Sequence, residues 1–188
     1  MQDSNGNSTT GLTEADIQVI VAQAQQGNTD GFARLFDIFS DRIYRFFRVR
    51  LSDNETAEDL TQTVFLEMLQ ALKRYRTQNN AKFSTWLFQI ARFRLIDHYR
   101  QHRQHVSIDD IPAQAHPNLS VDAVAYELPV TEDLLNKLPE NFRTVLHLRY
   151  QEQLTTNEIA QVLKTSAINI RVLHHRAIRA ARKLLPPT

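Results

Sequence analysis

The chain has 188 residues, of which 42% are hydrophobic and 23% are charged, with a formal net charge of +1 and no cysteine. This balance is typical of a globular protein of one ordinary domain or two small ones, and it excludes disulfides, thiolate metal sites and cysteine nucleophiles. The four glycines all precede residue 32 without phosphate-loop spacing, and no apolar run reaches the roughly 18–20 residues of a membrane helix, so we expect neither a phosphate-binding loop nor membrane insertion.

Capping residues and apolar residues at helical spacing predict four helices before residue 104. The first helix follows a polar N-terminal tail that lacks the features of a secretory signal, and Gly27-Asn28 ends it. The fourth helix is long and extends to about Arg103. The residues predicted to cap the four helices are, in chain order, Thr13, Asp30, the pair Ser52-Asp53, and Ser84.

The helical pattern stops between residues 104 and 129, where three prolines and several acidic residues occur without a sustained period. We interpret this segment as a flexible linker, and four shorter helical segments follow it. No strand or internal repeat is evident. The sequence therefore predicts an all-α protein with a tail and first helix at 1–28, a helical domain at 29–103, a linker at 104–129 and a second helical domain at 130–188.

Residues 155–185 have the layout of a helix-turn-helix. A capping box at Thr155 opens a short helix, a three-residue turn follows, and a longer basic helix begins at Ala167. Residues Ile170, Leu173, Ala177 and Leu184 are expected to face the core. Asparagine and arginine read adenine and guanine edges in the major groove, so we expect DNA contacts from the other side of this helix. Those candidates are Asn169, Arg171, His175, Arg176, Arg179 and Arg182.

The helix near residues 82–103 combines cations with aromatic side chains. Cations bind phosphates, and exposed aromatic rings stack on unpaired bases. We expect Trp86 and Phe93 to be core residues and Tyr99 to be more open. The charge pattern agrees with a polyanionic partner: residues 29–103 carry thirteen basic and nine acidic side chains, and residues 139–188 carry eight and three. The segment between them is acidic.

Five segments together resemble the sigma-70 family, and the absence of intervening domains resembles its small bacterial extracytoplasmic-function (ECF) class. These segments are 57–66 (AEDLTQTVFL), 83–92 (FSTWLFQIAR), 95–100 (LIDHYR), 138–139 (LP) and 158–160 (EIA). The resemblance implies a cytoplasmic sigma factor that binds core RNA polymerase and directs transcription initiation from promoter −10 and −35 elements. Small sigma factors of this class are often held by anti-sigma proteins, so such a partner is also implied.

The resemblance also implies roles for particular residues. The helix that docks on polymerase would contain Asp59, Gln62, Phe65 and Leu66, and Glu67 lies on its polar side. The −10 element would be bound by the amide-rich loop before the fourth helix and by the helix itself, through Asn79, Asn80, Lys82, Arg92, Asp97 and Arg100. The −35 element would be read by the last helix, through the candidates already named.

Two other interpretations remain open at this point. The chain could be a stand-alone helix-turn-helix regulator, with residues 1–103 as a sensing or dimerising domain. His98, His102 and His105 have possible metal spacing, but a third firm ligand is missing, so we predict no metal and no cofactor. We also expect no enzymatic activity, because no catalytic grouping can be argued from these residues.

Overall fold

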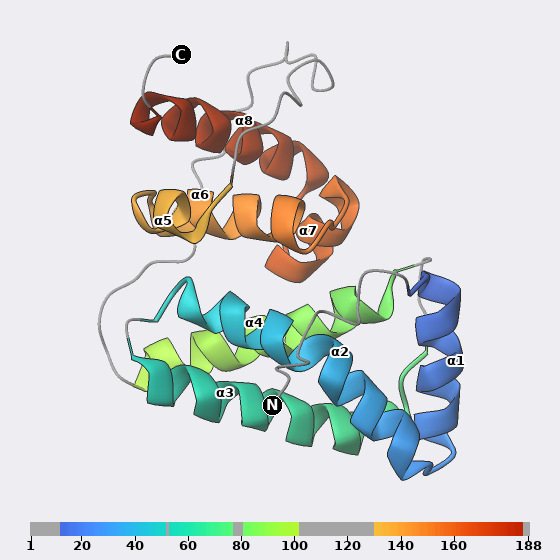
Figure 1. Ribbon diagram of the computed structural model, residues 1–188. Coiled ribbons are helices and arrows are strands. Elements are labelled where there is room, and N and C mark those ends of the chain that lie inside the picture. Colours follow the sequence, from blue (N-terminus) through green and yellow to red (C-terminus); the bar gives the residue numbers. More distant parts are fainter. Residues whose placement is uncertain (1–11, 52, 77–80, 102–129, 186–188) are drawn as a thin grey trace, which may run out of the picture.

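The computed structural model describes residues 12–51, 53–76, 81–101 and 130–185. Every regular element in these ranges is helical, which confirms the predicted all-α class. Helices α1–α4 make up the lower part of Figure 1, and α5–α8 make up the upper part. The predicted linker at 104–129, with Asn79 and Asn80 of the predicted −10 loop, lies outside the described residues.

The N-terminal half consists of α1 (Glu14–Gln25), α2 (Thr29–Arg48), α3 (Asn54–Leu72) and α4 (Phe83–Gln101). The predicted capping box at Thr13 is present, and Asp53 caps α3 through the Thr56 amide. Two predicted caps are wrong. The side chain of Asn28 caps α2 instead of Asp30, because it accepts hydrogen bonds from two first-turn amides. Ser84 lies buried inside α4, which begins one residue earlier.

Two polar side chains of α1 connect it to the neighbouring helices. The Gln25 Nε2 amide donates to the carbonyl oxygens of Leu72 (3.0 Å), the last residue of α3, and of Tyr75 (2.9 Å), which follows it. The Glu14 carboxylate accepts from the Phe83 amide at the start of α4, at 3.2 Å. Backbone groups at helix ends have no partner inside the helix, so α1 satisfies groups that α3 and α4 leave open.

The C-terminal half consists of α5 (Glu132–Asn136), α6 (Glu140–Leu146), a π-helical turn η1 (His147–Gln151), α7 (Thr156–Leu163) and α8 (Ala167–Leu184). Pro139 is the N-cap of α6, whose first helical residue is Glu140. The π-helical turn was not predicted by the sequence pattern. It continues α6 directly and ends beside Glu152, a buried carboxylate.

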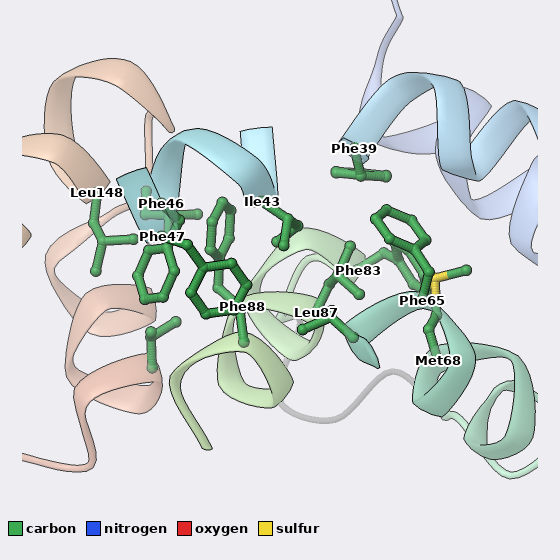
Figure 2. Close-up of a cluster of buried hydrophobic side chains, with 14 of the residues drawn as sticks. Phe39, Ile43, Phe46, Phe47, Phe65, Met68, Phe83, Leu87, Phe88 and Leu148 are labelled. Atoms are coloured by element: carbon green, nitrogen blue, oxygen red, sulfur yellow. The ribbon is translucent and has the colours of Figure 1, made fainter. Parts of the chain in front are cut away.

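One continuous hydrophobic core extends through both halves. Buried residues of α2, α3 and α4 contact buried residues of η1, α7 and α8 in a single cluster. Figure 2 shows Leu148 of η1 beside Phe46 and Phe47 of α2, and all three side chains are buried. Burying a leucine side chain contributes about 1.5–3 kcal/mol. The two predicted domains are therefore packed against each other in this structure, and α7 lies on α4.

A second, smaller cluster lies between α5, α6 and α8. It contains Leu135, Leu146 and Ala177, all fully buried, and Val49 from the end of α2 joins it. This cluster holds α8 along α6 and thereby fixes the orientation of the last helix. The fold thus positions α8 at the surface of the C-terminal half, with one side buried and the other available to a partner.

Candidate nucleic-acid and partner interfaces

The helix-turn-helix is built by capping interactions at each of its joints. The Glu158 carboxylate accepts from the Thr155 amide at 2.7 Å, and the Thr155 hydroxyl accepts in turn from the Glu158 amide at 3.3 Å. Lys164 has a left-handed backbone with φ 49° at the end of α7, and Ser166 then caps α8. These contacts confirm the predicted capping box and the predicted three-residue turn.

The two sides of α8 differ in burial as the sequence predicts. Ile170, Leu173 and Ala177 are buried. The prediction for Leu184 is wrong: this residue is 45% exposed, because it is the last residue of the helix and extends beyond the cluster below. Among the cationic candidates Arg171, Arg179 and Arg182 are exposed, while His175 and Arg176 are half-buried. The exposed cations follow one another along the helix at spacings of eight and three.

The start of α8 exposes an apolar residue, Ile168, which is not among the predicted site residues. Ile168 is 58% exposed, whereas the neighbouring Asn169 is half-buried and its amide donates to the Thr165 hydroxyl at 3.2 Å. The helical spacing between Ile168 and Arg171 was the available signal, because it places both on the same side. The outward side of α8 therefore begins with an apolar residue and continues with cations.

Tyr150 and His174 form a polar contact between η1 and α8. The tyrosine hydroxyl lies 3.1 Å from Nε2 of His174, and the two rings stack. Burial raises the pKa of Tyr150 and lowers the pKa of His174, with nearby Arg149 further lowering the latter. His174 is therefore neutral at neutral pH and adds no positive charge to this surface.

The basic helix α4 carries side chains in several different states. Lys82 is half-buried, with its Nζ atom 3.8 Å from the Glu158 carboxylate, and Arg92 is also half-buried. Asp97 is bound to Arg94 at 3.2 Å, and Arg100 is exposed. These four candidates lie within α4 or just before it. Because they differ in exposure, they do not form one uniformly exposed surface.

The aromatic residues of α4 only partly follow the predictions. Trp86 packs on Tyr75, with ring centroids 4.7 Å apart, in agreement with a core role. Phe93 is 48% exposed, so its predicted core position is wrong, because its side of α4 is left open by the described part of the chain. Tyr99 is half-buried, and its hydroxyl donates to the Arg50 carbonyl at 3.2 Å.

The exposed side of α3 combines polar and apolar residues. Asp59 and Gln62 are exposed, and Leu66 is 61% exposed. Phe65 is buried, and its ring lies 4.7 Å from the ring of Phe36 on α2. The exposed apolar residues Phe36, Leu66 and Leu69 on α2 and α3 are called the α2–α3 apolar surface below.

Glu67 borders this side of α3. Its carboxylate lies 2.5 Å from the Arg94 guanidinium and is half-buried, so it connects α3 to α4 within the fold. Among the sequence-predicted residues of α3, Asp59, Gln62 and Leu66 are thus exposed, whereas Phe65 is buried and Glu67 is half-buried.

The sequence and structure match known proteins over both halves. The family description "Sigma-70 region 2" matches residues 35–105, and "Sigma-70, region 4" matches residues 134–183. The chain is 31% identical to the ECF RNA polymerase sigma factor SigW of Bacillus subtilis (strain 168), covering 92% of this chain and 98% of the relative. It is 30% identical to the ECF RNA polymerase sigma factor BldN of Streptomyces coelicolor (strain ATCC BAA-471 / A3(2) / M145), covering 92% and 67%.

The chain belongs to the ECF class of the sigma-70 family. Two solved structures support the fold alone. One is CnrH in complex with the cytosolic domain of CnrY, with a TM-score of 0.63 and 23% identity over 89% of this chain and 95% of that one. The other is the sigma factor RpoE in complex with the anti-sigma factor NepR from Bartonella quintana, with a TM-score of 0.60 and 17% identity over 81% and 95%.

Membership in this family defines the activity. This sigma factor binds core RNA polymerase and directs promoter-specific transcription initiation. The match to region 2 across α2–α4 disfavours a stand-alone helix-turn-helix regulator, in which those helices would have a sensing or dimerising role. No helix within the described ranges combines the length and apolar character needed to cross a membrane. The same residues contain no group of three or more side chains suited to hold a metal, and His102 and His105 lie outside them.

Proposed function

We propose that the two halves of the sigma factor bind different parts of the polymerase–promoter complex. In the N-terminal half, residues 29–103 dock on core polymerase through α3 and bind the −10 element through α4. In the C-terminal half, residues 130–188 bind the −35 element through α8. The observation that carries this proposal is the difference in burial between the two sides of α8. Its inner side is buried, whereas its outer side carries exposed arginines.

The polymerase contact consists of the exposed side of α3. Asp59 and Gln62 supply polar contacts, and the α2–α3 apolar surface supplies buried area once the partner is bound. Exposed large apolar side chains of this kind on a globular protein commonly mark a protein interface. Phe65 contributes from the core by supporting Phe36, and Glu67 contributes by holding α3 to α4 through Arg94.

The −10 contact consists of the loop before α4 and the outer side of α4. Asn79 and Asn80 read an unpaired base with amide groups that both donate and accept. Lys82, Arg92 and Arg100 hold phosphates, and Asp97 orients Arg94 between α3 and α4. Exposed Phe93 is available for stacking on a base, a role that aromatic side chains fill in single-strand binding.

The −35 contact consists of the outward side of α8. Recognition helices contact bases with their N-terminal turns and phosphates further along. Arg171 and His175 therefore read bases, and Arg179 and Arg182 hold the backbone, with Arg176 beside them. The Asn169 amide is bound to Thr165, so it reads a base only through its remaining hydrogen-bonding capacity.

The sigma factor acts in the cytoplasm by binding alone, with no catalysis of its own. An anti-sigma protein is a further partner. This chain shares the fold of the sigma factor RpoE, whose solved structure is a complex with the anti-sigma factor NepR.

Transcription from a promoter library tests the proposal directly. Purified core polymerase is incubated with the library, with and without the chain, and the transcripts are sequenced. We expect a shared −10 and −35 pattern that appears only with the chain. Arg171→Ala should change that pattern at the −35 element, whereas Lys137→Ala, which removes an exposed cation directly after α5 in the same half, should leave it unchanged. An identical pattern for wild type and Arg171→Ala would contradict the role given to α8.

A further inference from the structure

The first turn of α8 presents an aliphatic side chain at its most accessible position. Of residues 167–170, only Ile168 is exposed, at 58%, and the others are half-buried or buried. Helix-turn-helix proteins contact base edges with the N-terminal residues of their second helix. Ile168 therefore lies where a base-reading side chain is expected, although it has no hydrogen-bonding group.

The polar residue of the same turn is already engaged within the protein. The Asn169 side-chain amide donates to the Thr165 hydroxyl at 3.2 Å, and its backbone amide donates to the Ser166 hydroxyl at 3.1 Å. Both contacts hold Asn169 against the turn between α7 and α8, where it is half-buried. The side chain that this turn extends furthest toward a partner is thus Ile168, and not an amide.

The charge around Ile168 favours DNA as the partner. The 18 residues of α8 include five arginines and lysines and no aspartate or glutamate. Arg171, three residues further along the same side, is exposed, and the apolar Val172 is half-buried. The cations supply the attraction to a polyanion. An aliphatic side chain cannot bind a phosphate, so Ile168 is left to contact the bases.

Thymine offers the group that an aliphatic side chain recognises in the major groove. This group is its C5 methyl, which apolar side chains contact directly, whereas the other bases present only hydrogen-bonding groups or a ring hydrogen at this edge. Isoleucine is β-branched and has one strongly preferred χ1 rotamer in a helix. Its methyl groups are therefore held in place before binding, and they cover a thymine methyl with little loss of rotamer freedom.

We propose that Ile168 determines −35 specificity by contacting the C5 methyl of one thymine. This inference rests on the proposed function of α8. Residues three apart lie about 4.5 Å apart along a helix axis, close to the 3.4 Å between successive base pairs. Ile168 and Arg171 should therefore contact neighbouring base pairs. Arginine binds guanine in the major groove, so the −35 element should contain a thymine next to a guanine.

Replacing thymine by uracil tests this contact, because it removes only the methyl group. Holoenzyme binding is measured on a promoter selected from the library, with each thymine of the −35 element on either strand replaced in turn by deoxyuridine. One position should lose about fourfold in affinity, the factor that corresponds to burial of one methyl-sized group. It should lie beside the position where Arg171→Ala relaxes preference. Equal affinity for all the substituted duplexes would overturn the proposal.

Variants of Ile168 show whether this side chain makes the contact. Ile168→Ala should abolish the preference for thymine over uracil at that position, whereas Ile168→Val, which keeps a branched side chain, should retain it. Val19→Ala is the matched control, because Val19 on α1 is also 58% exposed, and it should leave the preference unchanged. Thermal unfolding should be the same for all these proteins, because both side chains are exposed. A preference that persists in Ile168→Ala would refute the assignment.

Two further measurements separate the possible failures. Ile168→Ala should bind core polymerase without DNA as tightly as wild type does, and a loss of about tenfold there would assign Ile168 to a protein contact and overturn the proposal. Replacing the whole −35 element should weaken binding of the wild-type holoenzyme. Absence of that loss would refute the proposed function of α8 itself, whereas a loss without any sensitivity to uracil would refute only the role of Ile168.

Discussion

The buried histidine at the interface predicts a specific loss of stability in mild acid. His147 in η1 is fully buried, with its ring 6.2 Å from the ring of Phe46. Burial, together with the positive charge of nearby Arg50, lowers the pKa of His147 to about 3 from its usual 6.5. The folded protein therefore holds this side chain neutral, and protonation favours the unfolded chain.

The sign and size of the effect follow from proton linkage. Because the pKa is depressed in the folded state, the contribution of His147 is fully retained above pH 6.5 and is lost as the pH falls toward 3. At pH 5.0 the loss is about 2 kcal/mol, since each pH unit below the unfolded pKa costs about 1.4 kcal/mol. Glu152 acts in the opposite direction, because burial raises its pKa and acid relieves the cost of its charge.

Urea unfolding of paired variants isolates the histidine. The free energy of unfolding is measured at pH 7.5 and pH 5.0 for the protein with His147 and for His147→Leu, which fills a similar space without a titrating group. His174 is present in both proteins, so its contribution cancels to first order. Glu152 Oε1 lies 3.6 Å from His147 Nε2, so both proteins carry Glu152→Gln to remove its titration. The protein with His147 should lose about 2 kcal/mol more than the His147→Leu variant between the two pH values. Parallel losses in the two proteins would refute the assignment of a neutral buried histidine.

Three further outcomes test other parts of the structure. Leu66→Arg should weaken association with core polymerase by at least about tenfold, measured by fluorescence anisotropy, without changing thermal stability, because the side chain is exposed. Arg171→Ala should cost about 1–3 kcal/mol and relax preference at one or two −35 base pairs, whereas Arg182→Ala should weaken binding to all sequences and lower the salt slope by about one unit, in salt-titrated binding of the holoenzyme to mutated duplexes. Phe88→Ala should cost about 3–5 kcal/mol in urea unfolding, because Phe88 is fully buried, and a loss below 1 kcal/mol would contradict its place in the core.

Local signals in the sequence predicted the helices and the helix-turn-helix well. The capping box at Thr155 and the stripe of Ile170, Leu173 and Ala177 depend on residues close together in the chain, and both are present. The errors arose where a choice between neighbouring residues depends on backbone detail. Asn28 and Asp30 are both good capping residues, and only the path of the chain after α1 decides between them.

Contacts between distant segments could not be predicted from these patterns. The ion pair between Arg42 and Glu152 joins residues 110 positions apart, and neither residue has a sequence neighbour that signals the other. Phe93 illustrates the same limit: an aromatic residue on a helix suggests a core position, but exposure depends on which side the other helices cover. The exposed residues of α8 were easier to predict, because the apolar stripe identifies the buried side of the helix and the remaining residues must then face outward.

The hydrogen bonds of α1 have a practical consequence for dividing the protein into fragments. The region-2 match begins at residue 35, beyond α1, so a fragment cut at that boundary would lose Glu14 and Gln25. The Leu72 and Tyr75 carbonyls and the Phe83 amide would then lose their side-chain partners, and the apolar side of α2 that packs on Ile20 and Val21 would meet water. A useful N-terminal fragment should therefore start no later than Thr13, so that it keeps α1 and the hydrogen bonds that α1 makes to the ends of α3 and α4.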